Sequence, residues 1–365
     1  MKLIHTADWH FGYRQYGFRE REQDFYAAGH YIAERAVALK VDGVIIAGDI
    51  FDMPKPPADA VIETQNIVSE LTRNGIPVYG IDGNHDTVQG LWLKICGIIP
   101  LKTEPCVGPT DIAIAGIHAL RPSVFNEAID KLVEAGTHID VLVIHQALGE
   151  FADFEAQEIT AMEMAGRLAK IGVRYVAMGD IHDYHETVVG GIRFVYPGAS
   201  EVNAIDESHD CSFSVVDITT DTLKTSYEPI PIRPIIETHL TEEKQLDQLL
   251  ADITVPEGDR VPLAVVWYEP DVKELSKRAE KILRENNVLH RICPLSAAAK
   301  GTIAAQMARH SFERKGAMSQ LKDAVQAFFA DDSDQYELVF QLLAAPDSVT
   351  EIIRQYFESK GITVT

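Results

Sequence analysis

Short apolar runs alternate with helical patterns over roughly the first 230 residues, and this alternation limits the chain to an α/β fold. Within the helical segments, every third or fourth residue is apolar, as expected for one buried face. Two later segments, 211–218 and 224–232, follow each other as antiparallel strands. We therefore expect α/β layers with a partly antiparallel sheet. The apolar runs lie at 3–4, 44–46, 78–79, 112–114, 141–144, 175–177 and 194–196, and the two helix faces comprise Phe25, Ala28, Ile32, Ala36 and Leu39, and Val61, Gln65, Val68 and Leu71.

The rest of the chain predicts two further parts. Paired prolines in 230–234 indicate a linker, and 235–295 predicts strand, helix, strand, helix, strand, with a strand at 263–267 and a helix at 272–286. Residues 310–365 have helical stripes, and Ser348 with Glu351 forms a capping box. This segment either packs on its own domain or docks another chain through Phe312, Leu321, Val325, Phe328, Ile352, Ile353, Tyr356 and Phe357. The expected division is 1–232, a small α/β domain at 233–300, and a helical segment at 301–365.

Composition and charge restrict the cellular setting. No apolar run reaches the roughly 20 residues that span a bilayer, and Asp8 and His10 come too early for a signal peptide. Four widely spaced cysteines indicate reduced thiols, so we expect a soluble cytoplasmic protein without membrane partners. The net charge of -22 is unusual for a protein that binds DNA through phosphate contacts. Either a partner supplies positive surface, or the substrate is not long DNA.

Five polar motifs each follow an apolar run. In α/β sheets, loops at the carboxyl ends of strands meet in one crevice, so these motifs could bring their polar groups together. Glycines beside the polar residues permit tight turns and close backbone approach. The motifs are Asp8-Trp9-His10, Gly48-Asp49-Ile50-Phe51-Asp52, Gly83-Asn84-His85-Asp86, Ile144-His145-Gln146 and Gly179-Asp180-Ile181-His182.

Carboxylate, imidazole and amide groups together suit divalent manganese, iron or zinc, and the absence of thiolates excludes a structural zinc finger. One ion could not use so many ligands. Two ions about 3.5–4 Å apart could, if they shared one carboxylate and a bridging hydroxide, and such a pair stabilises in-line attack on phosphorus. The sequence thus predicts a two-metal phosphoesterase.

The order DxH, GDxxD, GNHD, H, GxxH resembles the calcineurin-like metallophosphoesterase superfamily. The opening Ile4-His5-Thr6-Ala7-Asp8-Trp9-His10-Phe11-Gly12 and the turn Tyr196-Pro197-Gly198-Ala199-Ser200 are similar to its SbcD-type branch, the nuclease subunits of double-strand-break repair complexes. The specific resemblance covers residues 1 to about 200. It implies a layered α/β/β/α core of two mixed sheets, with 233–300 matching the family's capping domain in size and position only.

The resemblance also implies a role for each motif residue. Asp49 would bridge two divalent ions, manganese in the first place and magnesium as an alternative. His85 would not be a ligand but would protonate the leaving oxygen, and Asp52 could hold its ring. The first ion would be bound by Asp8, His10, Asp49 and His182, and the second would be completed by Asn84, His145 and Asp180.

Asp180 departs from the family pattern, which has His-x-His at this place. A carboxylate still binds a hard divalent ion, and its spacing from His182 favours Asp180 as the ligand. The alternative is that His185 reaches in and Asp180 lies behind it. Arg14, Arg19 and Arg21 could contact DNA phosphates, although interleaved acidic residues favour a solvated helix start.

The resemblance implies 3′-to-5′ exonuclease activity on duplex DNA and endonuclease activity on single strands. It also implies an SbcC-type coiled-coil ATPase as partner, docked through the C-terminal helices, and a homodimer. Two alternatives stay open from the residues alone. One is a phosphoesterase for small molecules or phosphoproteins, which explains the acidity more simply. The other is a catalytically weak scaffold for the ATPase, which only Asp180 supports.

Overall fold

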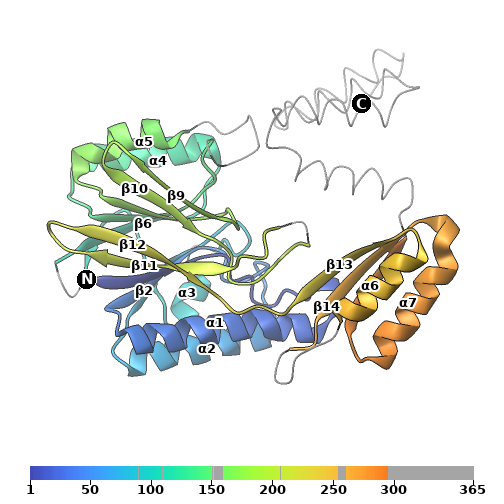
Figure 1. Ribbon diagram of the computed structural model, residues 1–365. Coiled ribbons are helices and arrows are strands. Elements are labelled where there is room, and N and C mark those ends of the chain that lie inside the picture. The colour runs from blue at the N-terminus through green and yellow to red at the C-terminus, as the bar shows by residue number, and fades with distance from the viewer. Residues whose placement is uncertain are drawn as a thin grey trace, which may run out of the picture.

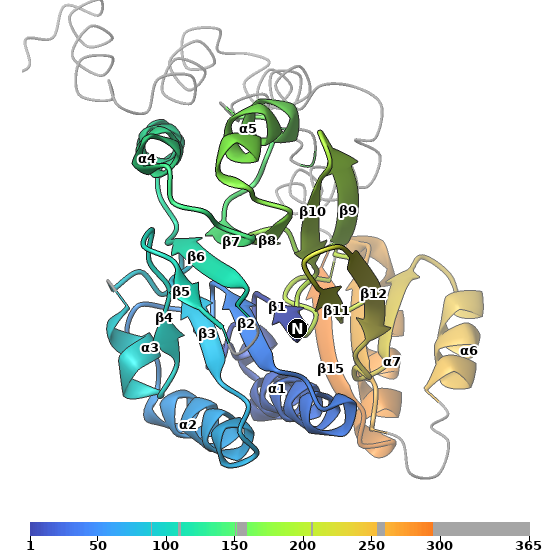
Figure 2. The same cartoon turned by 90° about the vertical axis from the view of Figure 1, so that its left-hand side faces the viewer.

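Two six-stranded mixed sheets stacked face to face form the larger part of the molecule (Figure 1). The computed structural model describes residues 1–88, 90–108, 111–149, 151, 159–205, 207–253 and 260–294. In Figure 2, helices α4 and α5 lie on one side of the two sheets, and α1 and α2 lie on the other. This arrangement confirms the predicted α/β/β/α layers.

The first sheet has the strand order β12-β11-β1-β2-β3-β4. β1 to β4 are parallel, and β11 and β12 add an antiparallel edge. Helices α1 and α2 pack on its outer face, and α3 is a single short turn. The elements are β1 (Lys2–Thr6), the 3-10 turn η1 (Gln15–Gly17), α1 (Arg19–Leu39), β2 (Gly43–Ala47), α2 (Ala58–Arg73), β3 (Val78–Ile81), α3 (Leu91–Ile95), β4 (Ile99–Pro100), β11 (Ser212–Ile218) and β12 (Leu223–Pro229).

The second sheet has the order β5-β6-β7-β8-β10-β9. Its four central strands are parallel, and both edge strands are antiparallel to their neighbours. Helices α4 and α5 cover its outer face. The elements are β5 (Cys106–Val107), β6 (Ala113–Ile117), α4 (Pro122–Ala135), β7 (Val141–His145), α5 (Ala161–Leu168), the 3-10 turn η2 (Ala169–Ile171), β8 (Tyr175–Gly179), β9 (Tyr184–Val189) and β10 (Ile192–Pro197).

The inner faces of the two sheets bury a shared apolar layer. Leu3, Ile45 and Ile81 of the first sheet pack in one cluster with Val143 and Ala177 of the second. Strands buried on both faces require continuous apolar runs, which is why these segments were recognisable in the sequence. The two sheets therefore pack against each other through their inner faces. The carboxyl ends of their parallel strands lie along one edge of this interface, here called the seam.

The predicted helix faces are largely observed. On α1, four of the five predicted residues are buried, and Leu39 is partly buried against the same cluster. On α2, Val68 and Leu71 are buried and Val61 is partly buried against the same cluster, as predicted. Ala60, Thr64 and Ile67 are buried there, whereas the Gln65 side chain donates a hydrogen bond to the carbonyl oxygen of Ile95. The prediction that Gln65 lies on the buried face was wrong.

A third, three-stranded parallel sheet follows the prolines, with two helices against it (Figure 1). Its elements are β13 (Ile235–Leu240), α6 (Glu243–Asp252), β14 (Leu263–Tyr268), the 3-10 turn η3 (Pro270–Val272), α7 (Lys273–Glu285) and β15 (Leu289–Pro294). The predicted strand at 263–267 and helix at 272–286 are thus confirmed. The predicted domain boundaries remain predictions, and the helical segment 301–365 lies outside the described residues. In the described part of the chain, no helix is both long and apolar enough to cross a membrane.

A buried ion network joins the linker to α1. The Asp24 carboxylate accepts hydrogen bonds from Arg21 Nη1 at 2.9 Å and from Arg233 Nε and Nη2 at 2.6 and 2.9 Å. Arg21 also donates to Glu201 Oε1 at 3.0 Å. Since Arg21 is fully buried, it is neither a solvated helix start nor a surface contact for DNA phosphates, and both readings of this residue were wrong.

Candidate metal centre

The five polar motifs converge at the seam between the two large sheets. Asp8 and His10 follow β1, Asp49 follows β2, and Asn84 follows β3, all in the first sheet. The second sheet contributes His145, the last residue of β7, and Asp180 and His182, which follow β8. In each of three groups, one ligand atom per residue lies within 4.8 Å of the others: Asp8 with His10 and His182, His10 with Asp52 and His85, and Asp8 with Asp49 and His145.

Strained backbone brings these side chains together. Asp8, His10, Asp49 and Asp180 all have positive φ, and they make up half of the eight described non-glycine residues with that geometry. Such conformations are costly for residues with a Cβ and concentrate at functional sites.

Glycine is required where the loops meet. A Cβ on Gly83 would overlap the Asp49 carboxylate, and a Cβ on Gly179 would lie 2.6 Å from His145 Nδ1. Gly48 has φ +94°, and a Cβ there would also collide with the His145 ring. The predicted role of these glycines, close approach of backbone to the site, is therefore observed.

Asp86 holds two of the loops at the site together through hydrogen bonds to their backbones. It is buried, its Oδ2 accepts hydrogen bonds from the backbone of Ile50 at 2.8 Å and Phe51 at 3.3 Å, and its Oδ1 accepts one from Gly83 at 2.8 Å. This carboxylate therefore links the loop after β2 to the loop after β3. The sequence motif contained Asp86 but did not reveal this structural role.

His145 has the orientation of a metal ligand. Its Nδ1 lies 2.8 Å from the carbonyl oxygen of Ala47, to which it donates, so Nε2 faces the centre of the cluster. Nε2 is 2.8 Å from Asn84 Oδ1, 3.3 Å from Asp49 Oδ2 and 3.8 Å from Asp180 Oδ1. A backbone carbonyl that fixes one ring nitrogen and frees the other is typical of metal-binding histidines.

His182 is oriented by a residue that the sequence analysis missed. Its Nδ1 donates to Glu207 Oε1 at 2.7 Å, and the other oxygen of Glu207 accepts from the backbone of Asn203 and Ala204 at 3.1 and 3.0 Å. His182 Nε2 thereby faces His10 Nε2 at 3.3 Å. Glu207 lies in a loop without any motif, and nothing in the sequence pairs it with His182.

The electrostatics of the cluster fit a bound cation. Burial alone would lower the pKa of His145, but its hydrogen bond to Asp49 and the charges of Asp49, Asp8 and Asp180 raise it to about 10. Burial raises the pKa of Asp8 to about 7. Protons therefore balance the crowded carboxylates when no metal is bound, and divalent ions would replace them. His10 Nδ1 is buried and has no hydrogen-bond partner among the described residues.

Asp180 and His185 lie in different surroundings. Asp180 Oδ1 points toward His145, and its Oδ2 accepts a hydrogen bond from the backbone of Ala147 at 2.8 Å. His185 lies on β9, with its ring centroid 5.6 Å from that of Phe151 and 6.5 Å from that of Tyr196. The geometry thus brings Asp180, rather than His185, to the cluster.

His85 lies at the exposed rim of the centre. Its side chain is 43% exposed, and its backbone N–H donates to Asp49 Oδ1 at 2.9 Å. Its ring Nδ1 is 2.9 Å from the carbonyl oxygen of Asp52 and 4.0 Å from the Asp52 carboxylate. We expected the Asp52 carboxylate to hold the His85 ring, but the backbone carbonyl of Asp52 is the group that lies closer to it.

A comparison with protein families agrees with this architecture. The model of the calcineurin-like phosphoesterase superfamily domain matches residues 1–221. The chain belongs to this superfamily. The match ends in the turn between β11 and β12, so it covers both large sheets except for the edge strand β12 and leaves the third sheet outside.

Similar proteins carry names from DNA repair. The DNA double-strand break repair protein Mre11 of Methanosarcina mazei is 31% identical over 286 residues, which cover 74% of this chain and 45% of that protein. The protein of the same name from Methanosarcina acetivorans is 29% identical over 335 residues, covering 86% and 53%. The chain thus spans about half the length of these relatives. A dimetal phosphatase from Danio rerio has a TM-score of 0.41 at 10% identity, covering 63% of this chain and 96% of that one.

Proposed function

We propose that this chain is a two-metal phosphodiesterase that hydrolyses DNA. The observation that carries the proposal is the convergence of carboxylate, imidazole and amide ligands from both sheets on one point, with an exposed histidine at its rim. The similarity to proteins named for DNA double-strand break repair supports DNA as the substrate. Manganese is the ion that we propose first, with magnesium as an alternative, because oxygen ligands outnumber imidazoles at the second position.

Each ion would have its own set of side chains, with Asp49 shared. Two divalent ions bound there would supply Lewis acidity to the phosphate and to a water molecule. Glu207 holds the His182 ring, and Ala47 holds the His145 ring, so these imidazoles need no reorganisation on binding. The first set comprises Asp8, His10, Asp49 and His182, and the second comprises Asp49, Asn84, His145 and Asp180.

His85 would act as the general acid. Because Nδ1 donates to the carbonyl oxygen of Asp52, the ring is held with Nε2 free to face a phosphate at the rim. Protonation of the leaving oxygen from that nitrogen would complete the cleavage. We expect His85→Ala to lower the rate of manganese-dependent hydrolysis roughly a hundredfold while the bound metal content stays equal. A catalytically weak scaffold would show no loss in this variant.

The same proposal includes two activities. One is 3′-to-5′ exonuclease activity on duplex ends, and the other is endonuclease activity on single strands. We also propose that the chain forms a homodimer and that an SbcC-type coiled-coil ATPase docks on its residues 301–365. The net charge of -22 supports a partner that supplies the positive surface for DNA, since this chain alone repels phosphates. Truncation after residue 305 should abolish binding of the ATPase, and retained binding would refute the docking assignment.

A substrate panel tests the function directly. End-labelled duplex and single-stranded DNA, a cyclic nucleotide and a phosphopeptide are each incubated with manganese and the protein, with and without the ATPase. We expect cleavage of DNA, stimulated by the ATPase. Hydrolysis of only the cyclic nucleotide or the phosphopeptide would instead support the small-molecule or phosphoprotein alternative.

A further inference from the structure

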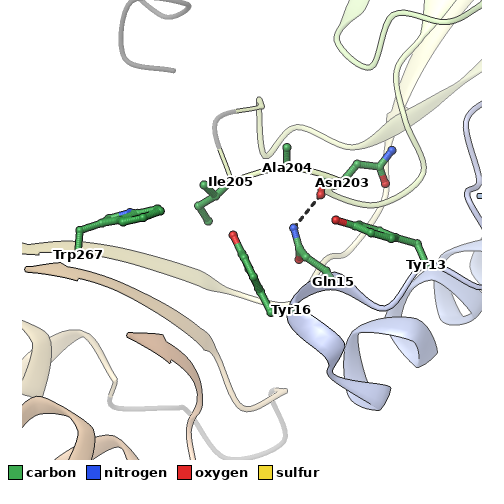
Figure 3. A pocket seen from close by; sticks show the side chains of 7 residues that line it. All are labelled: Tyr13, Gln15, Tyr16, Asn203, Ala204, Ile205 and Trp267. Carbon is green, nitrogen blue, oxygen red and sulfur yellow. Dashed lines mark hydrogen bonds between the residues drawn. The ribbon is translucent and has the colours of Figure 1, made fainter. Parts of the chain in front are cut away.

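A pocket of about 170 Å³ lies beside the candidate metal centre, between the large core and the third sheet (Figure 3). Three aromatic side chains line it: Tyr13, Tyr16 and Trp267. The amide side chains of Gln15 and Asn203 line it as well, and Gln15 Nε2 donates to the carbonyl oxygen of Asn203 at 2.9 Å. In Figure 3, Trp267 and Tyr13 lie at opposite ends of the labelled group, with Tyr16 between them. Among the residues that the structure describes, no charged side chain lines the pocket.

The pocket is connected to the proposed ligands through short contacts. The side-chain nitrogen of Asn203 lies 3.4 Å from His182 Nδ1, and the backbone N–H of Asn203 donates to Glu207. At the same end, the backbone of Tyr13 donates to the carbonyl oxygen of His10 at 3.1 Å. A nucleotide whose phosphate lies at the metal centre could therefore extend its base into this pocket.

The chemistry of the lining favours a neutral aromatic ligand over an anion. Trp267 Nε1 donates to Glu237 Oε1 at 3.0 Å. At the other end, burial and the negative charges of Asp52 and Glu207 raise the pKa of the Tyr13 phenol. These negative charges disfavour a phosphate. Aromatic side chains, in contrast, bind any nucleobase by stacking on its face. Asn203 Oδ1 is buried without a hydrogen-bond partner among the described residues, so the amide could bond to a base edge.

The backbone at Tyr16 supports a binding role. Tyr16 has φ 56° inside the turn η1, a left-handed conformation that bulky side chains avoid. The kink brings the ring to the cluster in which Ile205 and Trp267 also pack. Local strain of this kind is retained where the surrounding structure enforces it, and it concentrates at binding sites.

We infer that this pocket holds one unpaired nucleobase next to the phosphate being cleaved, with Trp267, Tyr16 and Tyr13 as its walls. The inference rests on the proposed nuclease function and specifies its substrate. A base inside a duplex is already paired and stacked, so it must be released before it can enter. The pocket would therefore select single strands and opened ends over intact duplex.

An abasic walk along a single-stranded oligonucleotide tests the inference. One tetrahydrofuran residue replaces each nucleotide in turn, and the products of manganese-dependent cleavage are mapped with the full chain. We expect the wild-type protein to cleave the phosphate next to the missing base about tenfold more slowly, since stacking on aromatic side chains is lost. Because this comparison changes only the substrate, it stands even if a protein variant fails to fold.

Variants identify the side chain responsible. Trp267→Leu should cleave the normal oligonucleotide about as slowly as wild type cleaves the abasic one, and it should show no further abasic penalty. Trp267→Phe should keep the penalty. Tyr268→Leu is the matched control, because it changes the next residue of β14, which packs with the helix-covered cluster instead of the pocket. It should also keep the penalty.

The outcomes separate the two proposals. Equal cleavage at normal and abasic positions by an active protein would overturn the base pocket and leave the nuclease function intact. The same result is expected if a protein segment fills the pocket. Absence of manganese-dependent cleavage of every oligonucleotide would overturn both proposals.

Discussion

Glu207 determines how the His182 ring faces the proposed metal. We expect Glu207→Gln to weaken manganese binding roughly 10- to 100-fold, because carboxylates that orient ligand histidines contribute on that scale. Titration of the metal-free protein with manganese in a calorimeter measures the change. Glu280→Gln, an exposed glutamate on α7, is the control and should bind as wild type does. Equal affinity in both variants would contradict the orienting role.

His5 should make the metal-free protein less stable in acid. Its Nδ1 accepts from the Tyr175 hydroxyl at 2.8 Å, its Nε2 donates to the carbonyl oxygen of Met178, and burial lowers its pKa to about 3. The unfolded chain binds this proton near pH 6.5 and the folded chain does not. The free energy of unfolding should therefore fall as the pH falls from about 6.5 to about 3, with up to about 1.4 kcal/mol per pH unit from this residue.

The measurement is urea unfolding in EDTA at about pH 7 and about pH 5. His5→Gln removes the titrating group, so its free energy of unfolding should depend less on pH than that of wild type. His138→Gln, at a mostly exposed histidine, should retain the wild-type pH dependence. A His5→Gln slope equal to that of wild type would show that His5 titrates normally.

At the scale of elements, the loop after β2 depends on Gly48. We expect Gly48→Ala to lower the free energy of unfolding by about 2 kcal/mol, because alanine is strained at φ +94° and its Cβ would collide with the His145 ring. Urea unfolding measures the change. Gly166 in α5 is the matched control, since no atom of the described residues outside its own helix backbone lies within 4 Å of its added Cβ. Gly166→Ala should instead stabilise the protein by about 0.5–1 kcal/mol.

The sequence predicted the strands that carry the site because each is an apolar run that ends abruptly in a polar motif. β9 was not predicted, since Tyr184–Val189 mixes polar and apolar residues on a sheet edge. On α2, Gln65 was counted with its apolar neighbours, but Thr64, one position earlier, is the polar residue that is buried there. Local sequence patterns predict whether a segment is a helix or a strand. Which face of a helix is buried depends on the sheet against which it packs.

Residues that act through distant partners could not be predicted. The seven residues proposed as ligands could be selected from the sequence because each lies beside a strand end in a recognisable motif. Glu207 and Arg21 were missed or misread, since Glu207 meets His182 from a loop without a motif and Arg21 meets Glu201 across 180 residues. Contacts between residues so far apart are formed by the tertiary fold, and no characteristic spacing in the sequence indicates them.

For the whole molecule, Asp24 links α1 to the linker that leads into the third sheet. Its carboxylate pairs with Arg21 and Arg233, and Arg260 lies 3.4 Å away. We expect Asp24→Ala to lower the free energy of unfolding by about 3–5 kcal/mol, because it leaves the buried Arg233 guanidinium without a carboxylate and Arg21 with Glu201 alone. Glu274→Ala removes an exposed partner of Lys277 and should leave the free energy of unfolding nearly unchanged. Similar losses in the two variants in urea unfolding would contradict the anchoring role.

The division of the proposed ligands between two sheets has a consequence during protein synthesis. During translation, Asp8, His10, Asp49 and Asn84 leave the ribosome early. His145 leaves only at the end of β7, and Asp180 and His182 leave after β8. At roughly 5–20 residues per second, seconds pass between the two groups. A nascent chain in that interval holds four of the seven proposed ligands, so the proposed centre could not assemble until the second sheet has folded onto the first.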